Sequence, residues 1–581
     1  MQWNLELIFK NKEEFNRSFL KAKELIDDLD KLKDIKNLSD INNLLKITDE
    51  IGVLISGLYT YVAMQFDKNQ KDVKSSNELQ QIMALYSDYL SVSSFIEPGI
   101  LKFELNEYIN SKEEKIVEHL YNIKKIFANK KHVLTEDKEL LLSNYNMLKS
   151  NQTDLYDMLS NGDEKEVEVI LNDGSKVLVS NGNYASLLDT LSNQDDRKKV
   201  FEVHFNNFEA HKNTYTGIYK GVLLSDLSDM KSRGYNSTLE MYLSNNNIPT
   251  RVYHSLIDVA RDTSSLVNRY NELRRSYFNL EKYHTYDRFL KFASIDEKYD
   301  YDKAKEVVLN AIKRFGDDFY NHTKEALADG RIDVYPSLGK RSGAYSTSVH
   351  NKGSFILLNY NNTLNDVFTL AHEAGHSVHS LYSNENQPLA TENYVIFVAE
   401  VASTFNEQAL LDYLLENIKD KNMKIAILQS GIESLIGTFY RQTLFAEYEL
   451  KAHQLIENNQ AITHEVLSKI MIDLYKEYFN IDIEKDESLK RYVWCYIPHF
   501  FHTPYYIYQY ATSFSASLAI YQNVKKDIKN FDNYLDLLKS GGSDYPINLI
   551  RKAGVDLTTT TPFLAVSNRL EELLEKLESL L

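Results

Sequence analysis

Residues 364–383 read LNDVFTLAHEAGHSVHSLYS, a run with the character of a single helix. His372 and His376 lie four residues apart, so a helix places both imidazoles on one face, where they can share a zinc ion. Glu373 stands beside them, placed to take a proton from a water that the metal activates. His379 shares the face of His372 and is expected to lie behind the ligands or in the core. This H-E-x-x-H arrangement is typical of zinc peptidases, although a solvated helix with ordinary histidines has the same spacing.

A catalytic zinc site needs a third protein ligand, which leaves the fourth position for water. A histidine ten residues after His372 would supply it, but that position is Tyr382, which argues against a three-histidine site. The other common solution is a glutamate on a following helix, and residues 394–414 have helical periodicity. Glu400 lies there in the apolar run VIFVAEVAS, where a lone carboxylate is costly unless it is paired or binds metal. We therefore predict Glu400 as the third ligand, with an interhelical ion pair as the alternative. Glu407, seven residues on, could orient a ligating histidine or lie on the surface.

Composition narrows the class of protein. The chain has 581 residues, too many for one simple core, so several subdomains are expected. A net charge of -17 argues against nucleic acid and against an anionic membrane surface as partners. The single cysteine, Cys495, excludes an internal disulfide framework and a cysteine-rich zinc site, and it fits a reducing compartment. No secretory signal and no membrane-spanning run is visible, so a cytoplasmic protein is expected.

The pattern along the chain predicts two regions. Residues from about 10 to 160 read as successive amphipathic helices. Residues 166–180, EVEVILNDGSKVLVS, read as a β-hairpin that turns at Asn-Asp-Gly. We therefore predict a helical region over 1–185 that ends in this hairpin, and a catalytic peptidase domain over 186–581.

A second break precedes the H-E-x-x-H helix. RIDVYP, from residue 331, is a short strand candidate, and LGKRSGAYSTS, residues 338–348, reads as a loop. GSFILLNY, residues 353–360, reads as an apolar strand that runs through a turn into the helix. Such a strand can pair with the extended backbone of a peptide, or it can be an ordinary buried strand.

Residues 497–512, IPHFFHTPYYIYQYAT, are dense in rings with polar tips. Hydrolysis of a peptide bond develops an oxyanion, and a neutral phenol is a good donor to it at pH 7. Tyr506 and Tyr510 are four residues apart, which predicts that they share one helical face. An aromatic core stripe is the alternative interpretation of this segment.

Four motifs in this order resemble those of the M3 peptidases, in particular oligoendopeptidase F, a type related to thimet oligopeptidase. They are AHEAGHSVH, FVAEVASTFNE, HFFHTPYYIYQYAT and SGGSDYPINLIRKAGVDL, and the similarity spans residues 339–557. The resemblance implies a mostly α-helical, two-lobed metallopeptidase of the zincin type. It also implies a small β-sheet beside the active-site helix and a deep channel that admits short unstructured peptides.

The resemblance further implies the roles of individual residues. One zinc ion per chain is expected on His372, His376 and Glu400, with Glu373 as the general base. Contacts with the substrate and the transition state are expected from His499, Tyr506 and Tyr510. Because relatives space this segment differently, three neighbours compete for substrate contact: His502, Tyr505 and Tyr508. The loop that contains Gly343 and Tyr345 resembles a substrate-side loop of the family.

These observations lead to one hypothesis and two rivals. The chain is expected to be a zinc-dependent endopeptidase of short oligopeptides, compatible with a monomer. One rival is an exopeptidase of the dipeptidyl-carboxypeptidase kind on the same scaffold. The other is a helical peptide-binding protein with a silent metal site, against which the intact set of ligands and base speaks.

Overall fold

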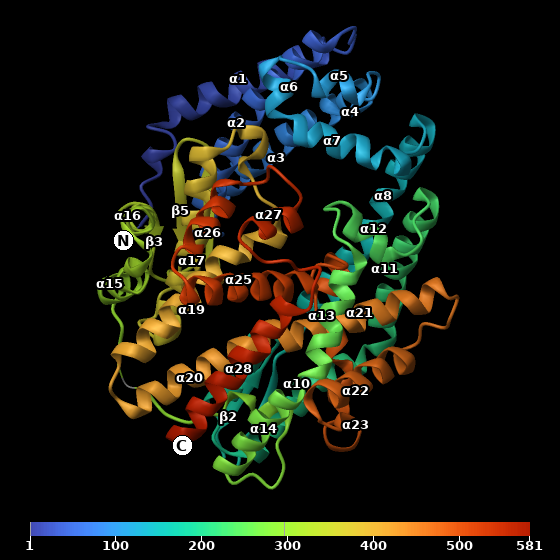
Figure 1. Cartoon of the computed structure of the whole chain (residues 1–581). Coiled ribbons are helices and arrows are strands. Elements are labelled where there is room, and N and C mark those ends of the chain that lie inside the picture. Colours follow the sequence, from blue (N-terminus) through green and yellow to red (C-terminus); the bar gives the residue numbers. More distant parts are fainter. Residues whose placement is uncertain (1, 296) are drawn as a thin grey trace. The chain divides into compact units, whose positions relative to one another are not determined.

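The computed structural model describes residues 2–295 and 297–581, with side chains for all of these except 136, 137, 140 and 143–150. Helices make up most of the chain, and two small sheets accompany them (Figure 1), which confirms the predicted mostly α-helical class. The chain forms two compact units, each assembled from three separate ranges. Unit 1 comprises Met1–Lys131, Asp296–Glu416 and Ser517–Val555, and unit 2 comprises His132–Ile295, Asn417–Ala516 and Asp556–Leu581. The boundary near residue 185 stays a prediction.

The elements of each unit follow the chain. Unit 1 holds α1 (Lys12–Asp30), α2 (Leu38–Lys68), α3 (Val73–Ser93), α4 (Ile96–Ile100), α5 (Leu105–Ile109), α6 (Glu114–Glu118), α7 (Leu120–Asn129), α15 (Tyr301–Ile312), α16 (Asp317–Ala326), β3 (Ile332–Asp333), β4 (Tyr345–Val349), β5 (Gly353–Leu357), α17 (Leu364–Asn386), α18 (Leu389–Glu392), α26 (Asn530–Lys539) and α27 (Pro546–Lys552). Unit 2 holds α8 (Glu136–Asp157), β1 (Val167–Ile170), β2 (Lys176–Val179), α9 (Tyr184–Thr190), α10 (Gln194–Ala210), α11 (Lys212–Arg233), α12 (Thr238–Ser244), α13 (Thr250–Asp262), α14 (Ser265–Tyr277), α20 (Lys421–Leu435), α21 (Gln442–Glu457), α22 (His464–Phe479), α23 (Ile483–Asp486), α24 (His499–His502) and α28 (Thr561–Leu580). Two helices continue from one unit into the other, α19 (Ile396–Asn417) and α25 (Tyr508–Lys526).

The N-terminal segment of unit 1 packs as the predicted succession of helices. α1, α2 and α3 lie side by side (Figure 1), and their apolar faces bury residues such as Leu29, Leu44 and Leu58. Trp3 precedes these helices and donates its indole N–H to the backbone oxygen of Ile356 at 2.7 Å. The start of the chain is thereby fixed to the small sheet of unit 1.

This small sheet has the strand order β3-β5-β4. β5 is parallel to β3 and antiparallel to β4, so it lies in the centre. The prediction that residues 338–348 form only a loop was wrong, because Tyr345 opens strand β4 and pairs with Leu357. The strand expected over 353–360 ends earlier, at Leu357. Of the two alternatives for this strand, the structure favours an ordinary buried strand, because β4 and β3 already flank it, whereas β4 forms an edge among the described strands.

α17 packs against β4 and β5 and carries the H-E-x-x-H motif, as predicted. Thr363 is the N-cap residue of this helix. Its hydroxyl accepts the backbone N–H of Asp366, and the carboxylate of Asp366 accepts the backbone N–H of Thr363. At Gly375 the helix comes into close contact with α19. A Cβ atom there would lie 2.5 Å from the carbonyl oxygen of Ala402 and 2.6 Å from Cα of Ser403. Glycine therefore permits a helix approach that no other residue allows.

Two glycines of the SGGSDYP motif, residues 540–546, allow a second close contact, with the segment that follows α17. Gly541 has φ +48°, and a Cβ atom there would lie 2.4 Å from the backbone oxygen of Thr391. Gly542 donates its N–H to that oxygen at 2.7 Å. The two glycines thus allow the loop after α26 to lie directly on α18, which follows the motif-bearing helix.

In unit 2, the predicted hairpin is confirmed. β1 and β2 pair in antiparallel register from Val167 with Val179 to Ile170 with Lys176, and Gly174 takes the left-handed φ of +86° in the turn. The helices of this unit bury a core rich in tyrosine, including Tyr219, Tyr253 and Tyr448.

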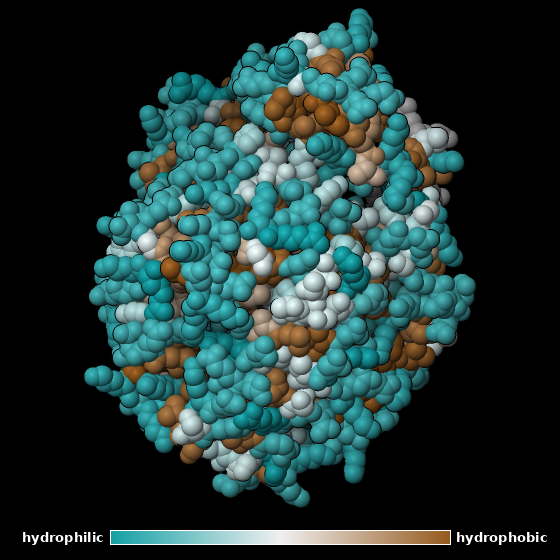
Figure 2. Space-filling model, in the orientation of Figure 1, coloured by the Kyte–Doolittle hydropathy of each residue, from teal (hydrophilic) through white to brown (hydrophobic). Residues whose placement is uncertain are grey.

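The visible surface is mainly polar. Figure 2 shows one face of the molecule, on which hydrophilic residues predominate and hydrophobic residues form small separate groups. Among the described helices, none combines the length and the apolar character needed to span a lipid bilayer.

The contact at Gly375 leads to a stability prediction. We expect Gly375→Ala to lower the free energy of unfolding by about 1–3 kcal/mol, because the new methyl group meets backbone atoms that cannot rotate away. Denaturant unfolding measures the change. Gly52→Ala in α2 is the matched control, since a Cβ atom at that position would have no neighbour within 4 Å and removing a helical glycine stabilises a helix. Equal stabilities of the two variants would contradict the close contact.

Candidate metal centre

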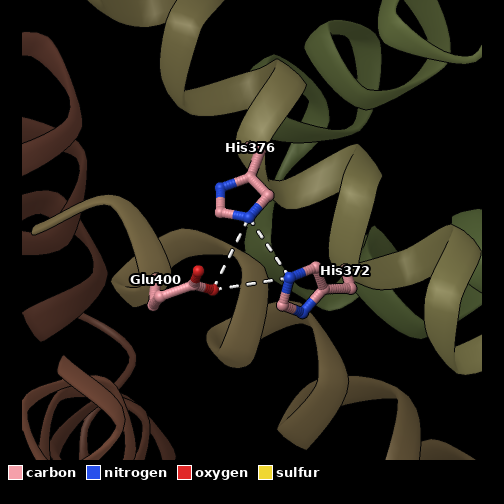
Figure 3. A group of neighbouring side chains, drawn as sticks. All are labelled: His372, His376 and Glu400. Carbon is pink, nitrogen blue, oxygen red and sulfur yellow. Dashed lines mark hydrogen bonds and ion pairs between the residues drawn. The ribbon is translucent and has the colours of Figure 1, made fainter. Parts of the chain in front are cut away.

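Two helices of unit 1 bring three metal-binding side chains together. His372 and His376 extend from α17, and Glu400 extends from the fifth residue position of α19. Figure 3 shows the two imidazoles and the carboxylate facing one another. Their side chains are about one fifth to one quarter exposed: 25% for His372, 19% for His376 and 20% for Glu400. They are held by packing and still open to a ligand.

The distances between the donor atoms suit zinc. Nε2 of His372 lies 3.2 Å from Nε2 of His376, and Oε2 of Glu400 lies 3.4 Å and 3.5 Å from these two nitrogens. Zinc bonds to nitrogen and oxygen are about 2.0–2.2 Å long, which separates two ligand atoms by about 3.3–3.6 Å in a tetrahedron. The triangle therefore matches one face of a tetrahedral site, and the described residues of the chain form no other such group of metal-binding side chains.

Glu407 fixes the orientation of His372. Its Oε1 lies 2.6 Å from Nδ1 of the imidazole, and it follows Glu400 by two helical turns along α19. A proton on Nδ1 then leaves the Nε2 lone pair free to face the other two donors. Burial lowers the pKa of His372, but the hydrogen bond and the charge of Glu407 and the charges of Glu373 and Glu400 outweigh it and raise the pKa to about 9. The surroundings of this ring thus favour a positive charge.

Glu373 has the environment expected of a general base. Its side chain is 6% exposed, and its Oε2 atom has no hydrogen-bond partner among the described residues. Burial raises its pKa to about 7, the charge of His372 opposes this, and the charges of Glu400 and Glu407 add to it. A carboxylate with a pKa near neutrality can both accept and return a proton.

Further contacts that the sequence did not reveal hold the other ligands in place. Ser403 donates its hydroxyl to Oε2 of Glu400 at 2.8 Å, and Asn406 donates to the backbone oxygen of Ala371, which joins α19 to α17. The spacing of Ser403, three residues after Glu400 on one helix, is the only sequence signal for this contact. Burial and the charge of His372 lower the pKa of His376 to about 4.

His379 lies on α17, three residues after His376, and is fully buried. Its ring stacks on Tyr394, with centroids 3.6 Å apart, and Tyr394 in turn lies 3.4 Å from the backbone oxygen of His376. Burial, with a smaller contribution from His376, lowers the pKa of His379 to about 3, so the ring is neutral.

Gly343 and Tyr345 lie at the start of β4. Gly343 takes φ +82° and lines a cavity of about 210 Å³ beside the first turn of α17, together with Asp366 and Thr369. Tyr345 donates its hydroxyl to Asp67 of α2 at 2.8 Å. The next residue of the strand, Ser346, contacts Ser377 of α17 through their hydroxyls at 2.8 Å. Substrate contact by Gly343 and Tyr345 stays a prediction.

The aromatic segment lies in unit 2 and divides into two groups. His499, Tyr506 and Tyr510 form a cluster in which Nε2 of His499 lies 3.3 Å from the hydroxyl of Tyr510 and the two tyrosine rings meet edge to face. Burial, followed by the charge of His502, lowers the pKa of His499, which keeps it neutral at pH 7. The prediction that Tyr506 and Tyr510 share a helical face was wrong, because α25 begins only at Tyr508. Tyr505, at φ +55°, turns the chain before the helix.

The remaining three residues of the segment lie differently. Tyr505 and Tyr508 are only 2% and 3% exposed, and the hydroxyl of Tyr505 lies 3.0 Å from that of Thr238. His502 is more exposed and pairs with Asp157 at 3.1 Å. Their roles in substrate binding stay predictions, while the geometry groups His499 with Tyr506 and Tyr510.

The chain is similar to known peptidases over its whole length. The sequence pattern described as peptidase family M3 matches residues 187–569. "Oligopeptidase PepF" of Bacillus subtilis is 35% identical over 100% of this chain and 87% of its own length. "Oligoendopeptidase F homolog" of Lactococcus lactis is 30% identical over 100% of this chain and 97% of its own length. The solved structure of oligoendopeptidase-F from Enterococcus faecium superposes with a TM-score of 0.76 at 28% identity, covering 98% of this chain and 99% of that one.

The contact between Glu407 and His372 leads to a second prediction. We expect Glu407→Gln to weaken zinc affinity about 10–100-fold, because the neutral amide orients the imidazole less firmly and donates less electron density to it. Competition with a chromogenic chelator measures the affinity. Glu416→Gln is the control on the same helix, since Glu416 pairs with Arg314 at 2.6 Å. Zinc affinity of Glu407→Gln within twofold of the parent would exclude the orienting role.

Proposed function

The chain belongs to peptidase family M3 and is a metallopeptidase, and we propose that it hydrolyses internal bonds of short oligopeptides with one zinc ion per chain. The observation that carries the proposal is the triangle of His372, His376 and Glu400, whose donor atoms have the spacing of a tetrahedral zinc site. The names of the relatives support peptides as substrates.

The zinc ion would supply a Lewis acid that polarises the scissile carbonyl and activates water. His372 and His376 would hold it through Nε2, and Glu400 would hold it through its carboxylate, which accepts a hydrogen bond from Ser403. Glu373 accepts the proton from the attacking water and passes it to the leaving amine. Its pKa near 7, raised by burial, suits both steps.

The protein also offers groups that could position the peptide and the developing charge. β4 presents an unpaired edge among the described strands, where an extended peptide backbone could add as a further strand. Within unit 2, the cluster of His499, Tyr506 and Tyr510 supplies neutral donors, and we assign to Tyr510 a hydrogen bond to the oxyanion. A deep channel for short unstructured peptides, a monomeric state and a cytoplasmic location remain part of the proposal; the last rests on the single cysteine.

The central test is hydrolysis of an internally quenched oligopeptide that is blocked at both ends. We expect cleavage within the peptide, because an endopeptidase needs neither terminus. A chelator should abolish the activity, and added zinc should restore it, with one zinc per chain by elemental analysis. Cleavage only of unblocked peptides would favour the exopeptidase, and no cleavage of any peptide by the zinc-loaded chain would favour the silent binding protein.

Glu373→Gln separates the base from the metal site in the same assay. We expect the variant to keep its zinc and to lose about 10²–10⁴-fold in turnover, because only proton transfer is removed. Glu385→Gln, near the end of the same helix, is the control; Glu385 lies beside His322 at 3.1 Å and is about half exposed. Near-parental hydrolysis by Glu373→Gln would contradict the assigned mechanism.

Tyr510→Phe tests the oxyanion donor. We expect kcat to fall about 10²–10³-fold with a smaller change in KM, because a donor to the oxyanion acts mainly in the transition state. Tyr505→Phe removes the hydroxyl of a buried neighbour that bonds to Thr238, and its kcat should change little. The reverse order of effects would assign the role to Tyr505.

A further inference from the structure

We propose that unit 2 binds a small organic anion, with a carboxylate or phosphate head on an apolar or aromatic body, in a cavity of its own. The cavity has a volume of about 260 Å³, and every residue that lines it belongs to unit 2. None of the residues assigned to metal binding or peptide hydrolysis lines it. Its volume suits a small molecule, and the proposal does not depend on the function proposed above.

Three cationic side chains line this cavity. They come from parts of the chain far apart in sequence: Arg288 lies in the short 3-10 helix Thr285–Phe289 after α14, Arg441 ends the π-helical segment Ile436–Arg441, and Lys490 lies between α23 and α24. Through their side chains, none of the three makes a hydrogen bond or an ion pair with a described residue. Two of them lie over aromatic rings: Lys490 over Phe205 at 4.6 Å and Arg288 over Phe289 at 4.2 Å.

The carboxylates nearby are occupied by other donors. Glu433 lines the cavity, but its Oε1 atom accepts from Arg274 at 3.0 Å and from Gln429 at 2.9 Å. Glu487 accepts the backbone N–H of Thr285 at 2.8 Å and also its hydroxyl. Since the charge of Arg274 offsets that of Glu433, the lining keeps an excess of positive charge in a chain whose net charge is -17.

The pKa values of two of these cations are lowered, so the cavity disfavours their charged forms. Burial and the charge of Arg288 lower the pKa of Arg441 to about 9. Burial and the charges of Arg288 and Arg441 lower the pKa of Lys490 to about 7, although Glu487 partly opposes this. Like charges held together away from water destabilise a protein unless an anion compensates them. A bound carboxylate or phosphate would provide that compensation, and arginine is well suited to bind either in bidentate fashion.

The rest of the lining fits an apolar or aromatic body. Rings from several elements face the cavity, among them Tyr283, Phe445, Tyr475 and Phe479. An apolar pocket with a few convergent charged groups is the usual form of a small-molecule site. The backbone conformation is a second indication of a functional site. π-Helical turns such as Ile436–Arg441 are rare and occur frequently at functional sites. α14 packs against α22 here, so helices on two sides hold the rings in place.

The test uses the full-length, zinc-loaded chain and defined probes. Calorimetry at pH 7 and low ionic strength measures binding of phenyl phosphate, phenylacetate, inorganic phosphate and benzyl alcohol. We expect one saturable site for phenyl phosphate or phenylacetate, weaker binding of inorganic phosphate, and none of neutral benzyl alcohol. Preference for one of the first two probes identifies the head group as phosphate or carboxylate.

Variants locate the site. Arg441→Gln and Lys490→Met should each weaken binding of the preferred probe about 10–100-fold, because each removes a charged donor. Arg275→Gln is the control and should bind as the parent does, since the side chain of Arg275 pairs with Glu272 on the same helix. Without a probe, both cavity variants should melt no lower than the parent, since each relieves repulsion within the cluster.

Three binding results would overturn the proposal. They are no saturable binding of either phenyl probe, unchanged binding in both cavity variants, or equally tight binding of benzyl alcohol. A lower melting temperature of both variants without probe would also contradict it, because the cations would then stabilise the fold without any ligand.

Discussion

The close contact of α17 with α19 at Gly375 is the constraint on which the proposed metal centre depends. The backbone of Ala402 and Ser403 lies where any side chain at position 375 would have to be. This approach brings Glu400, at the start of one helix, within 3.5 Å of the imidazoles on the other. The same contact between α17 and α19 includes the hydrogen bond that the Asn406 side chain donates to the backbone oxygen of Ala371. The glycine between the two histidines thus permits the helix approach that places Glu400 beside them as a candidate third ligand.

The charges around this contact explain why a cation belongs there. Glu373, Glu400 and Glu407 surround two imidazoles in a partly buried space, and one oxygen of Glu373 has no hydrogen-bond partner in the part of the chain that the structure describes. The carboxylates raise the pKa of His372, so they favour a positive charge on that ring whether a proton or a metal ion provides it. A cation bound here would offset the free-energy cost of burying the three carboxylates. In the proposed mechanism, the same cation would polarise the peptide carbonyl. Structure and chemistry depend on the same group of side chains.

Much of this organisation could be predicted from the sequence, because it is local. The four-residue spacing of His372 and His376 and the isolated carboxylate of Glu400 in an apolar helix carry their own physical signal. Strand β4 was missed because its small polar residues, such as Ser346, lack the pattern of a buried strand. The place of Tyr506 was misjudged because Tyr505 adopts a left-handed φ that helical periodicity does not register. The cationic cavity could not be predicted at all, since Arg288, Arg441 and Lys490 meet only through tertiary folding.

The most direct measurement is anomalous diffraction at the zinc absorption edge from crystals of the zinc-loaded chain. The account predicts one strong anomalous peak per chain, bonded to Nε2 of His372, Nε2 of His376 and a carboxylate oxygen of Glu400, with bonds of about 2.0–2.2 Å. Glu407 should remain hydrogen-bonded to Nδ1 of His372. A peak elsewhere, or a zinc ion bound to the two histidines without Glu400, would contradict the account.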